Sequence, residues 1–276
     1  MIWPTMEQPL VSIGVPTFNR PQLLRRALEL LVGQTYRNIE IIVSDNASPD
    51  DQTKKVVEEF ANGDGRIKYF RQPENIGAAN NFLFVLEKAA GDYFMWAADD
   101  DEWTSDFVDF GLAHIGNAGT IMGDIDTVFH VRGETTRSLV PNLDPTRSAF
   151  SNAKAFLGNM QPSILYGLHN TDFIRICVTR NTFDFWDCFV VYKIIINYGI
   201  RTYRGVRYRA GVATSEYEIK PCNQASNRLR YLPFVTATLK ETWACARLKL
   251  SEKITLALQI IYVTLSLYRH HSLRRK

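Results

Sequence analysis

Short apolar stretches with strand character alternate with segments of helical periodicity between residues 10 and 97, and this alternation limits the fold more than any other feature. Strands are predicted at residues 10–15, 39–43, 67–70 and 93–97, with helices between them at 19–33, 53–60 and 78–89. Such an alternation produces right-handed crossovers and a mostly parallel sheet. The sequence therefore predicts an α/β domain with flanking helices, which we place at residues 8–214.

The rest of the chain has weaker patterns. Residues 111–150 contain several Gly and Asp residues, which favour sheet edge and loops. The elements expected after residue 150 are a helix that ends at Gly199, strand-like pieces at 200–204 and 206–209, and mainly helical structure over 223–267. We therefore predict a separate C-terminal helical region at residues 215–276.

Composition excludes several classes of protein. The chain has 276 residues, of which 46% are hydrophobic and 22% charged, as in an ordinary globular protein. A net charge of +3 without dense clusters of Lys and Arg does not favour a nucleic-acid partner. The four cysteines have no paired spacing and predict neither a disulfide nor a zinc site. The first nine residues lack the apolar stretch of a signal peptide, so we expect a cytoplasmic protein.

The C-terminal segment 254–268 is largely apolar and is followed by basic residues up to Lys276. It is shorter than the roughly 20 apolar residues that a membrane-spanning helix needs. A helix lying on the inner face of the cell membrane, with its basic end near anionic lipids, fits the pattern. A core helix followed by a solvated tail fits it equally well, and the two interpretations stay open.

Polar residues follow the predicted strands where each one ends. Asp45 follows the second strand, and Asp99, Asp100 and Asp101 follow the fourth, while residues 16–19 form a turn after the first. Ligands of parallel α/β sheets bind outside the carboxyl ends of the strands, so we expect one edge of the sheet to carry the chemistry.

Three adjacent carboxylates are costly to ionise together unless a cation is present, and carboxylate oxygens prefer Mg²⁺ or Mn²⁺. In an extended backbone Asp99 and Asp101 point the same way and form a pair that could hold one ion, with Asp100 turned elsewhere. The alternative is a solvated acidic loop or a charge at a helix start.

The remaining polar positions each have two interpretations. Asp45 could accept hydrogen bonds from a nucleobase or ribose, or it could be a turn and cap residue. Asn19 could line the pocket or cap the following helix. Asn75 precedes a helix and is unremarkable alone, and His169 is expected to be a core or surface histidine.

Taken together, these motifs resemble a known family. The segments 11–20, 44–48, 75–77 and 98–103 resemble, in order and spacing, those of the family 2 glycosyltransferases, which have the GT-A fold. The resemblance covers about residues 10–110. Residues 184–187, Asp-Phe-Trp-Asp, more weakly resemble the Glu-Asp motif whose last residue is the family's catalytic base. The resemblance implies an inverting transfer from a nucleotide-diphosphate sugar, as in bacterial surface-polysaccharide assembly.

The resemblance also implies roles for individual residues. Asp99 and Asp101 would bind a Mn²⁺ or Mg²⁺ ion on the donor diphosphate, and Asp187 would deprotonate the acceptor hydroxyl. The nucleotide would be contacted by Pro16, Thr17, Asn19, Asp45, Asn75, Asp100 and Arg209. The metal would stabilise the charge on the leaving diphosphate, and partial burial would raise the basicity of Asp187.

Two positions depart from the family pattern. Trp186 stands where the family often has Glu, so Asp184 would have to supply that carboxylate. Gly211 stands two residues after Arg209, where the family often has His, so a third protein ligand for the metal would be missing. Arg209 itself could face the diphosphate or be a surface strand residue.

The acceptor is expected to be a glycan or lipid-linked glycan, selected by residues 123–161 and by the surroundings of Trp186. Uracil, thymine and guanine donors all stay open. A nucleotidyltransferase is the nearest rival enzyme, but residues 16–20 are not a Gly-rich phosphate loop, and a dehydrogenase would need a glycine fingerprint that is absent. A non-catalytic nucleotide-sugar or glycan-binding protein is the alternative from another class.

Overall fold

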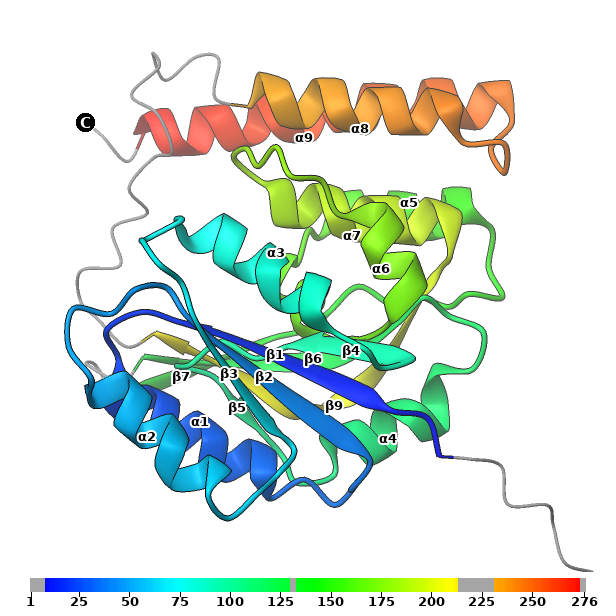
Figure 1. Cartoon of the computed structure of the whole chain (residues 1–276). Coiled ribbons are helices and arrows are strands. Elements are labelled where there is room, and N and C mark those ends of the chain that lie inside the picture. The colour runs from blue at the N-terminus through cyan, green and yellow to red at the C-terminus, as the bar shows by residue number, and fades with distance from the viewer. Residues whose placement is uncertain (1–7, 130–132, 213–230, 274–276) are drawn as a thin grey trace, which may run out of the picture.

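The computed structural model describes residues 8–129, 133–212 and 231–273. Its first half is the predicted α/β alternation (Figure 1). The elements are β1 (Val11–Thr17), α1 (Pro21–Val32), β2 (Ile39–Asp45), α2 (Gln52–Ala61), β3 (Ile67–Arg71), α3 (Ala78–Lys88) and β4 (Tyr93–Trp96). β1 pairs in parallel with β2 and β4, and β2 pairs in parallel with β3. The predicted parallel sheet is confirmed, and the carboxyl ends of β1, β2 and β4 lie at one edge.

Beyond β4 the sheet is mixed. The further strands are β5 (Glu102–Trp103), β6 (Thr120–Phe129), β7 (Glu134–Ser138), β8 (Leu168–Asn170) and β9 (Ile200–Val212). Among the described residues the strand order is β3-β2-β1-β4-β8-β6-β9-β5, with β7 paired to β6. β9 runs parallel to β6 and antiparallel to β5, which brings the chain after the Asp triplet beside the end of β9.

The expectation of sheet edge and loops over 111–150 is correct for β7, which pairs only with β6 among the described strands, and for the loop at 139–148, but it is wrong for the rest. This segment contains α4 (Phe107–Ile115) in part and the strand β6, which lies inside the sheet between β8 and β9. Asp124 and Asp126 interrupt its apolar pattern, yet both are buried. Arg204 donates to Asp124 at 2.7 Å, and Arg137 donates to Asp126 at 2.8 Å. Buried carboxylates are tolerated when they are paired. Arg137 lies opposite Asp126 on the adjacent strand β7, whereas Arg204 comes from β9, 80 residues from Asp124.

Helices cover both faces of the sheet. α1, α2 and α4 lie on one face, and α3, α5 (Ala149–Gly158), α6 (Thr171–Cys177) and α7 (Trp186–Asn197) lie on the other (Figure 1). α8 (Leu232–Ala244) and α9 (Leu250–Leu273) form an outer layer over α5 and α7. These two helices confirm the predicted helical C-terminal region from residue 232 on. Residues 223–230 and the expected boundary at 214/215 fall outside the described residues.

The start of α1 differs from the expectation that Asn19 caps it. Arg20 occupies the cap position, and no side chain bonds to the first turn. Asn19 adopts a left-handed backbone with φ of 54°, and its N–H donates to Oγ of Ser48 at 2.8 Å. Asn tolerates this conformation better than most residues. Asn19 therefore forms a turn fixed by Ser48 instead of a helix cap. The Arg20 side chain that follows this turn reaches Asp99 at the sheet edge.

His169 is a fully buried core residue on β8, as expected. Its Nδ1 lies 2.7 Å from Oγ1 of Thr120, and its Nε2 lies 2.7 Å from the carbonyl oxygen of Leu165. Because the carbonyl can only accept, Nε2 carries the proton and Nδ1 accepts from the hydroxyl. Burial lowers the pKa of His169 from 6.5 to about 4.

This histidine predicts a loss of stability in acid. Between pH 6.5 and about 4, His169 is protonated in the unfolded chain but stays neutral in the folded protein. The free energy of unfolding therefore falls as the pH is lowered through this range. The loss is about 3 kcal/mol if it is complete. Denaturant unfolding at pH 7 and pH 4.5 checks this: His169→Gln should be less stable at pH 7 but should lose less between the two pH values. Equal losses in both proteins would contradict it.

Candidate active site

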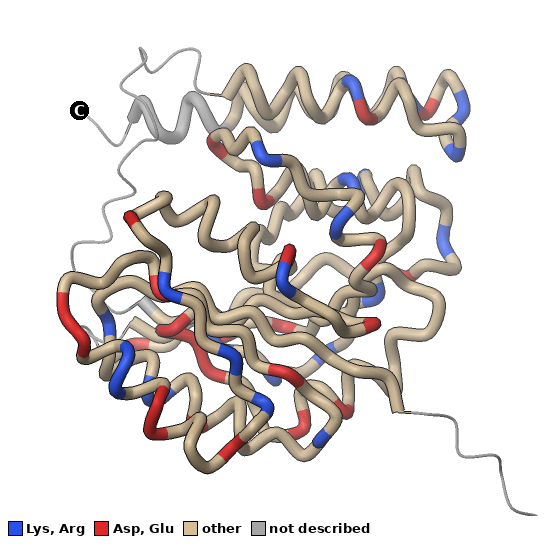
Figure 2. The backbone as a smooth tube through the Cα atoms, viewed as in Figure 1, with Lys and Arg blue, Asp and Glu red and all other residues tan. Residues whose placement is uncertain are grey.

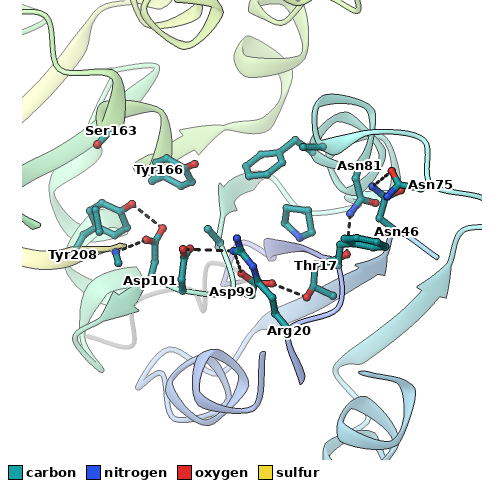
Figure 3. Close-up of a pocket in the computed structure, with 18 residues that line it drawn as sticks. Thr17, Arg20, Asn46, Asn75, Asn81, Asp99, Asp101, Ser163, Tyr166 and Tyr208 are labelled. Carbon is teal, nitrogen blue, oxygen red and sulfur yellow. Dashed lines mark hydrogen bonds and ion pairs between the residues drawn. The ribbon is translucent and has the colours of Figure 1, made fainter. Parts of the chain in front are cut away.

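A cavity of about 520 Å³ opens at the carboxyl ends of β1 and β4 (Figure 3). Its walls come from the turn after β1, the loop before α3, the Asp triplet, a 3-10 helix at Pro162–Tyr166 and the end of β9. The predicted residues that line it are Pro16, Thr17, Asn75, Asp99, Asp100 and Asp101. Segments far apart in sequence thus meet at the edge that the strand pattern predicted.

Asp99 lies at the β1 side of this cavity. Oγ1 of Thr17 donates to its Oδ2 at 2.7 Å, and Nη1 of Arg20 donates to its Oδ1 at 3.0 Å. The carboxylate is almost fully buried. Burial raises its pKa from 3.8 to about 6, against the lowering effect of Thr17 and Arg20. A further positive charge beside Asp99 would therefore stabilise its ionised form.

Asp101 lies at the β9 side. The Tyr208 hydroxyl donates to its Oδ2 at 2.7 Å, and the backbone N–H of Gly211 donates to its Oδ1 at 2.9 Å. Burial, with a smaller contribution from the neighbouring Asp100 and Asp99, raises its pKa from 3.8 to about 8. Asp100, between the two, is the more exposed carboxylate, and its Oδ2 lies 3.6 Å from Nη1 of Arg20.

The extended backbone expected for 99–101 is wrong. Asp99 and Asp100 lie in a turn, and the N–H of Asp101 donates to the carbonyl of Ala98 at 3.2 Å. The turn sends the Asp99 side chain toward Thr17 and the Asp101 side chain toward Tyr208 (Figure 3). The two carboxylates therefore face the cavity from different sides.

The carboxylates of the triplet are ligands of the kind that hard divalent ions prefer. All three carboxylates line one cavity, and two of them are buried with raised pKa values. Among the residues that the structure describes, no group of three His, Cys, Asp or Glu side chains is arranged to hold an ion alone. Mg²⁺ and Mn²⁺ sites of nucleotide enzymes commonly use one or two carboxylates together with substrate phosphates.

Gly211 has a steric reason to be glycine. A Cβ atom there would lie 1.7 Å from the carbonyl oxygen of Asp100. No side chain fits in that space, so histidine could not occupy this position without a shift of the backbone. Gly211 contributes its N–H to Asp101 instead of a side-chain ligand. The departure seen in the sequence is thus tied to the close approach of β9 to the Asp triplet.

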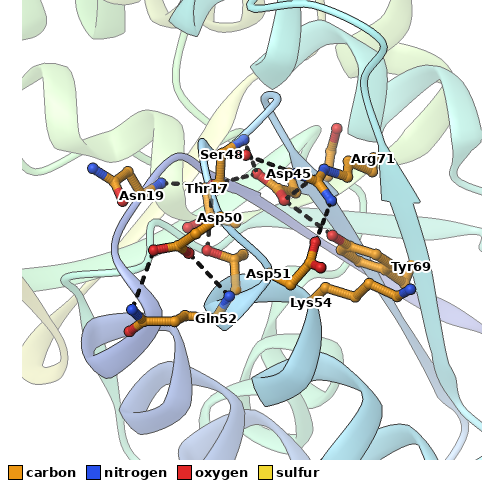
Figure 4. Close-up of polar contacts among 12 residues, drawn as sticks. Thr17, Asn19, Asp45, Ser48, Asp50, Asp51, Gln52, Lys54, Tyr69 and Arg71 are labelled. Carbon is orange, nitrogen blue, oxygen red and sulfur yellow. Dashed lines mark hydrogen bonds and ion pairs between the residues drawn. The ribbon is translucent and has the colours of Figure 1, made fainter.

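Asp45, at the end of β2, lies outside the cavity lining and belongs to a polar cluster with Ser48, Tyr69 and Arg71 (Figure 4). Its Oδ1 accepts from the N–H and hydroxyl of Ser48 at 2.9 and 2.5 Å, and its Oδ2 accepts from the Tyr69 hydroxyl at 2.9 Å. Nε of Arg71 lies 3.8 Å away. The structure thus shows the turn-stabilising contacts, while contact with a nucleobase stays a prediction.

Asn75 lines the cavity and is fixed by its neighbours. Nδ2 of Asn46 donates to its Oδ1 at 3.0 Å, and the N–H of Gly77 donates to the same atom at 2.9 Å. Oδ1 of Asn46 in turn accepts from the N–H of Ile76 at 2.9 Å. The loop before α3 is therefore held as one side of the cavity.

Two further predicted nucleotide residues are not brought to the cavity lining. Arg209 is 56% exposed, and its Nη1 lies 3.7 Å from Oε2 of Glu102. Tyr208 and Ala210 on either side line the cavity, so Arg209 points to the other face of β9. The structure thus shows the surface-strand arrangement of Arg209. Asn19 is exposed and is likewise outside the lining.

Asp187 lies in the first turn of α7 and is not part of the cavity lining. Its Oδ1 accepts from the N–H of Cys188 at 2.7 Å, and burial raises its pKa. Phe185 enters the helix through a left-handed backbone, with φ of 65°, and Nε1 of Trp186 donates to Oγ1 of Thr179 at 3.0 Å. A base role for Asp187 stays a prediction.

Several lining residues escaped sequence reasoning. Arg20 stood within the recognised motif 11–20 without a role of its own. Ser163 and Tyr166 come from the 3-10 helix, which follows the segment 123–161 expected to select the acceptor. Tyr166 stacks on Tyr208, with ring centroids 5.7 Å apart. The sequence of this helix, Pro-Ser-Ile-Leu-Tyr, is mostly apolar like a core segment, and it did not indicate a binding site.

The cavity lies at the carboxyl ends of the strands, where open α/β sheets bind their ligands, and three carboxylates line it. The sequence model of glycosyl transferase family 2 matches residues 12–189. The chain therefore belongs to glycosyl transferase family 2.

Relatives of known name share part of the chain. A GalNAc(5)-diNAcBac-PP-undecaprenol β-1,3-glucosyltransferase of Campylobacter jejuni is 43% identical over 98 residues, which is 35% of this chain and 31% of the relative. The glycosyltransferase GlyA of Streptococcus pneumoniae is 33% identical over 99 residues, 36% of this chain and 14% of the relative. The chain thus spans less than half of the length of these relatives.

Solved structures share the fold over almost the whole chain. S. aureus TarS in complex with UDP-GlcNAc has a TM-score of 0.72 at 16% identity, covering 96% of this chain and 75% of that one. The mannosyltransferase PcManGT from Pyrobaculum calidifontis, in complex with GDP-Man and Mn²⁺, has a TM-score of 0.56 at 17% identity, covering 97% and 84%. These likenesses confirm the GT-A fold.

Proposed function

We propose that the protein transfers a sugar, with inversion, from a nucleotide-diphosphate donor in this cavity to a glycan or lipid-linked glycan. The observation that carries the proposal is the cavity that joins Thr17, Asn75 and the Asp triplet. The named activity of the C. jejuni relative, on an undecaprenol-diphosphate-linked glycan, supports a lipid-linked acceptor. The UDP-GlcNAc bound by TarS and the GDP-Man bound by PcManGT support a nucleotide-sugar donor.

The Asp triplet would hold a Mn²⁺ or Mg²⁺ ion together with the donor diphosphate. Such an ion stabilises the negative charge that develops on the leaving diphosphate. Thr17 keeps the Asp99 carboxylate directed into the cavity, and Tyr208 and Gly211 do the same for Asp101. Because these hydrogen bonds already fix the carboxylates, the two side chains need not reorganise when the nucleotide sugar binds.

The acceptor hydroxyl needs a base on the opposite side of the sugar from the diphosphate, and we assign this role to Asp187. Its raised pKa makes it a stronger base than an ordinary aspartate. One displacement by the deprotonated hydroxyl then inverts the anomeric centre. Since Asp187 lies outside the cavity lining, the acceptor would lie between α7 and the Asp triplet.

The nucleotide would lie against Pro16, Thr17 and Asn75, with Asp100 near the ribose or sugar. We also propose contacts from Asp45, Asn19 and Arg209, each of which would need a local change. Asp45 is fully buried, so side chains around it would have to move before a base could contact it. Asn19 and Arg209 would have to turn toward the cavity.

Calorimetric titration tests the donor site. UDP, dTDP, GDP and CDP are titrated with and without Mn²⁺ into the wild-type protein, Asp99→Asn and the control Asp172→Asn, which changes an exposed carboxylate on α6. We expect one nucleotide to bind in the presence of Mn²⁺ and Asp99→Asn to weaken it at least ~10-fold, because a charge-assisted contact is lost. Binding of no nucleotide, or equal effects of both variants, would contradict the proposal.

We also propose that α9 lies on the cytoplasmic surface of the membrane. No helix within the described residues is long and apolar enough to cross a membrane. Large apolar side chains form an exposed stripe along the helix: Leu250, Ile254, Leu258, Ile261, Tyr262 and Leu265. Leu256 and Ile260 are buried on the other side, toward α5 and α8. Figure 2 shows basic positions at the turn between α8 and α9. Of these residues, Arg247 donates to the backbone carbonyls of Ile196 and Asn197, whereas exposed Lys249 would supply positive charge for anionic lipids.

Vesicle sedimentation tests this surface. Leu258 and Tyr262 are 65% and 72% exposed, so the double variant Leu258→Ser, Tyr262→Ser should fold normally. We expect it to bind phosphatidylglycerol vesicles at least ~10-fold more weakly than the wild type, because two apolar side chains no longer enter the interface. Ile176→Ser, at a site 58% exposed on α6, is the control and should bind normally. Equal binding by all three proteins would contradict the proposal.

A further inference from the structure

Arg20 reaches from the start of α1 across the cavity to the Asp triplet (Figure 3). Its Nη1 lies 3.0 Å from Oδ1 of Asp99 and 3.6 Å from Oδ2 of Asp100. One guanidinium thus bridges two of the three carboxylates. Its side chain is 35% exposed and lines the cavity, so it has room to move. Pro21 at the first helical position fixes the backbone from which it extends.

The guanidinium and a divalent ion need the same oxygens. Oδ1 of Asp99 is engaged by Arg20, while its Oδ2 is engaged by Thr17. A cation bound to Asp99 and Asp100 would therefore lie beside the positive charge of Arg20, and two like charges this close repel strongly in a partly buried site. Arg20 in its present place therefore weakens the binding of an ion to these carboxylates.

A departing Arg20 has a second anionic partner when the donor is present. A diphosphate held over the Asp triplet would lie in the same cavity that Arg20 lines. Guanidinium groups form bidentate hydrogen bonds both to carboxylates and to phosphates. The side chain can therefore exchange carboxylates for phosphate oxygens without leaving the cavity.

We propose that Arg20 is a positioning residue that occupies the cation place of the nucleotide-free site and moves to the donor diphosphate when the metal and nucleotide bind together. The inference rests on the proposed function for the diphosphate. It makes Arg20 a competitor of the free metal ion and a partner of the metal–nucleotide complex. Metal and nucleotide then bind cooperatively, because only their joint arrival supplies both exchange partners.

Mn²⁺ binding to the nucleotide-free protein, followed by electron paramagnetic resonance, tests the competition. We expect Arg20→Gln to bind Mn²⁺ at least ~10-fold more tightly than the wild type, because the competing charge is gone. Arg20→Lys keeps the positive charge but not the planar guanidinium, and it should bind Mn²⁺ more weakly than Arg20→Gln. Arg25→Gln changes an α1 arginine that pairs with Glu59 away from the cavity, and it should leave Mn²⁺ binding unchanged. Unchanged or weaker Mn²⁺ binding by Arg20→Gln would overturn the proposal.

The second half of the test uses the nucleoside diphosphate. In the presence of Mn²⁺, Arg20→Gln should bind it about 10-fold more weakly, so that the cooperativity between metal and nucleotide falls. Retained cooperativity in a folded Arg20→Gln protein would also overturn the proposal. If no protein binds any nucleoside diphosphate, the proposed donor site fails. The Mn²⁺ comparison alone then decides whether Arg20 holds the cation place.

Discussion

Replacing Asp187 with asparagine is expected to lower turnover by ~10²–10⁴-fold, because the acceptor hydroxyl loses its general base. The affinity for the nucleotide should stay within about twofold, because Asp187 does not line the donor cavity. Initial rates of sugar transfer and calorimetric Kd values for the same preparation measure the two quantities. In the wild type, activity should rise with pH through the pKa of Asp187, which burial places above the ordinary aspartate value.

Asp184→Asn is the matched control, because it changes the other carboxylate of the motif at residues 184–187. A large loss in Asp184→Asn together with normal rates in Asp187→Asn would move the base to Asp184. Normal rates in both variants would contradict a base in this motif. A protein that binds the nucleotide but never transfers sugar would instead support the non-catalytic binding alternative.

Gly211→Ala is expected to damage both the fold and the donor site. The added Cβ atom would lie 1.7 Å from the carbonyl oxygen of Asp100, so β9 or the Asp turn must shift. Overpacking of this kind typically costs about 1–3 kcal/mol of stability. A shift would also break the bond from the Gly211 N–H to Asp101, and we expect at least ~10-fold weaker nucleotide binding in the presence of Mn²⁺.

Gly65→Ala provides the comparison for this substitution, because a Cβ atom there would have no atom within 4 Å apart from those of Gly65 and its two chain neighbours. Denaturant unfolding and nucleotide titration of both variants give the result. Gly65→Ala should match the wild type in nucleotide affinity. A Gly211→Ala protein with wild-type stability and affinity would show that the close approach of β9 to Asp100 is not required.

The part of the fold that rests on local periodicity could be predicted from the sequence. β1 to β4 and their helices have apolar patterns that depend on their own residues, and all of them lie where the patterns indicate. β6 could not be found, because Asp124 and Asp126 break its pattern and are stabilised by Arg204 from β9 and by Arg137 from the adjacent strand β7. Tertiary pairing overrode the local signal.

The candidate site was predictable to the same extent. Thr17, Asn75 and the Asp triplet reach the cavity because strand ends of a parallel sheet converge, which the strand pattern implies. The direction of each side chain could not be predicted. The turn at Asp99 and Asp100 separates carboxylates that an extended chain would align, and the alternation of β9 turns Arg209 away. The contact of Arg20 with Asp99 depends on the left-handed backbone of Asn19, and apolar periodicity does not indicate such a turn.

The most direct test of the donor site is a crystal structure of the protein with Mn²⁺ and the nucleoside diphosphate that binds it most tightly. We predict the diphosphate in the cavity between Thr17 and Tyr208, with Mn²⁺ bound by the Asp triplet and the diphosphate oxygens. A diphosphate bound elsewhere on the chain, with the carboxylates of Asp99 and Asp101 still bonded only to Thr17, Arg20, Tyr208 and Gly211, would contradict this account.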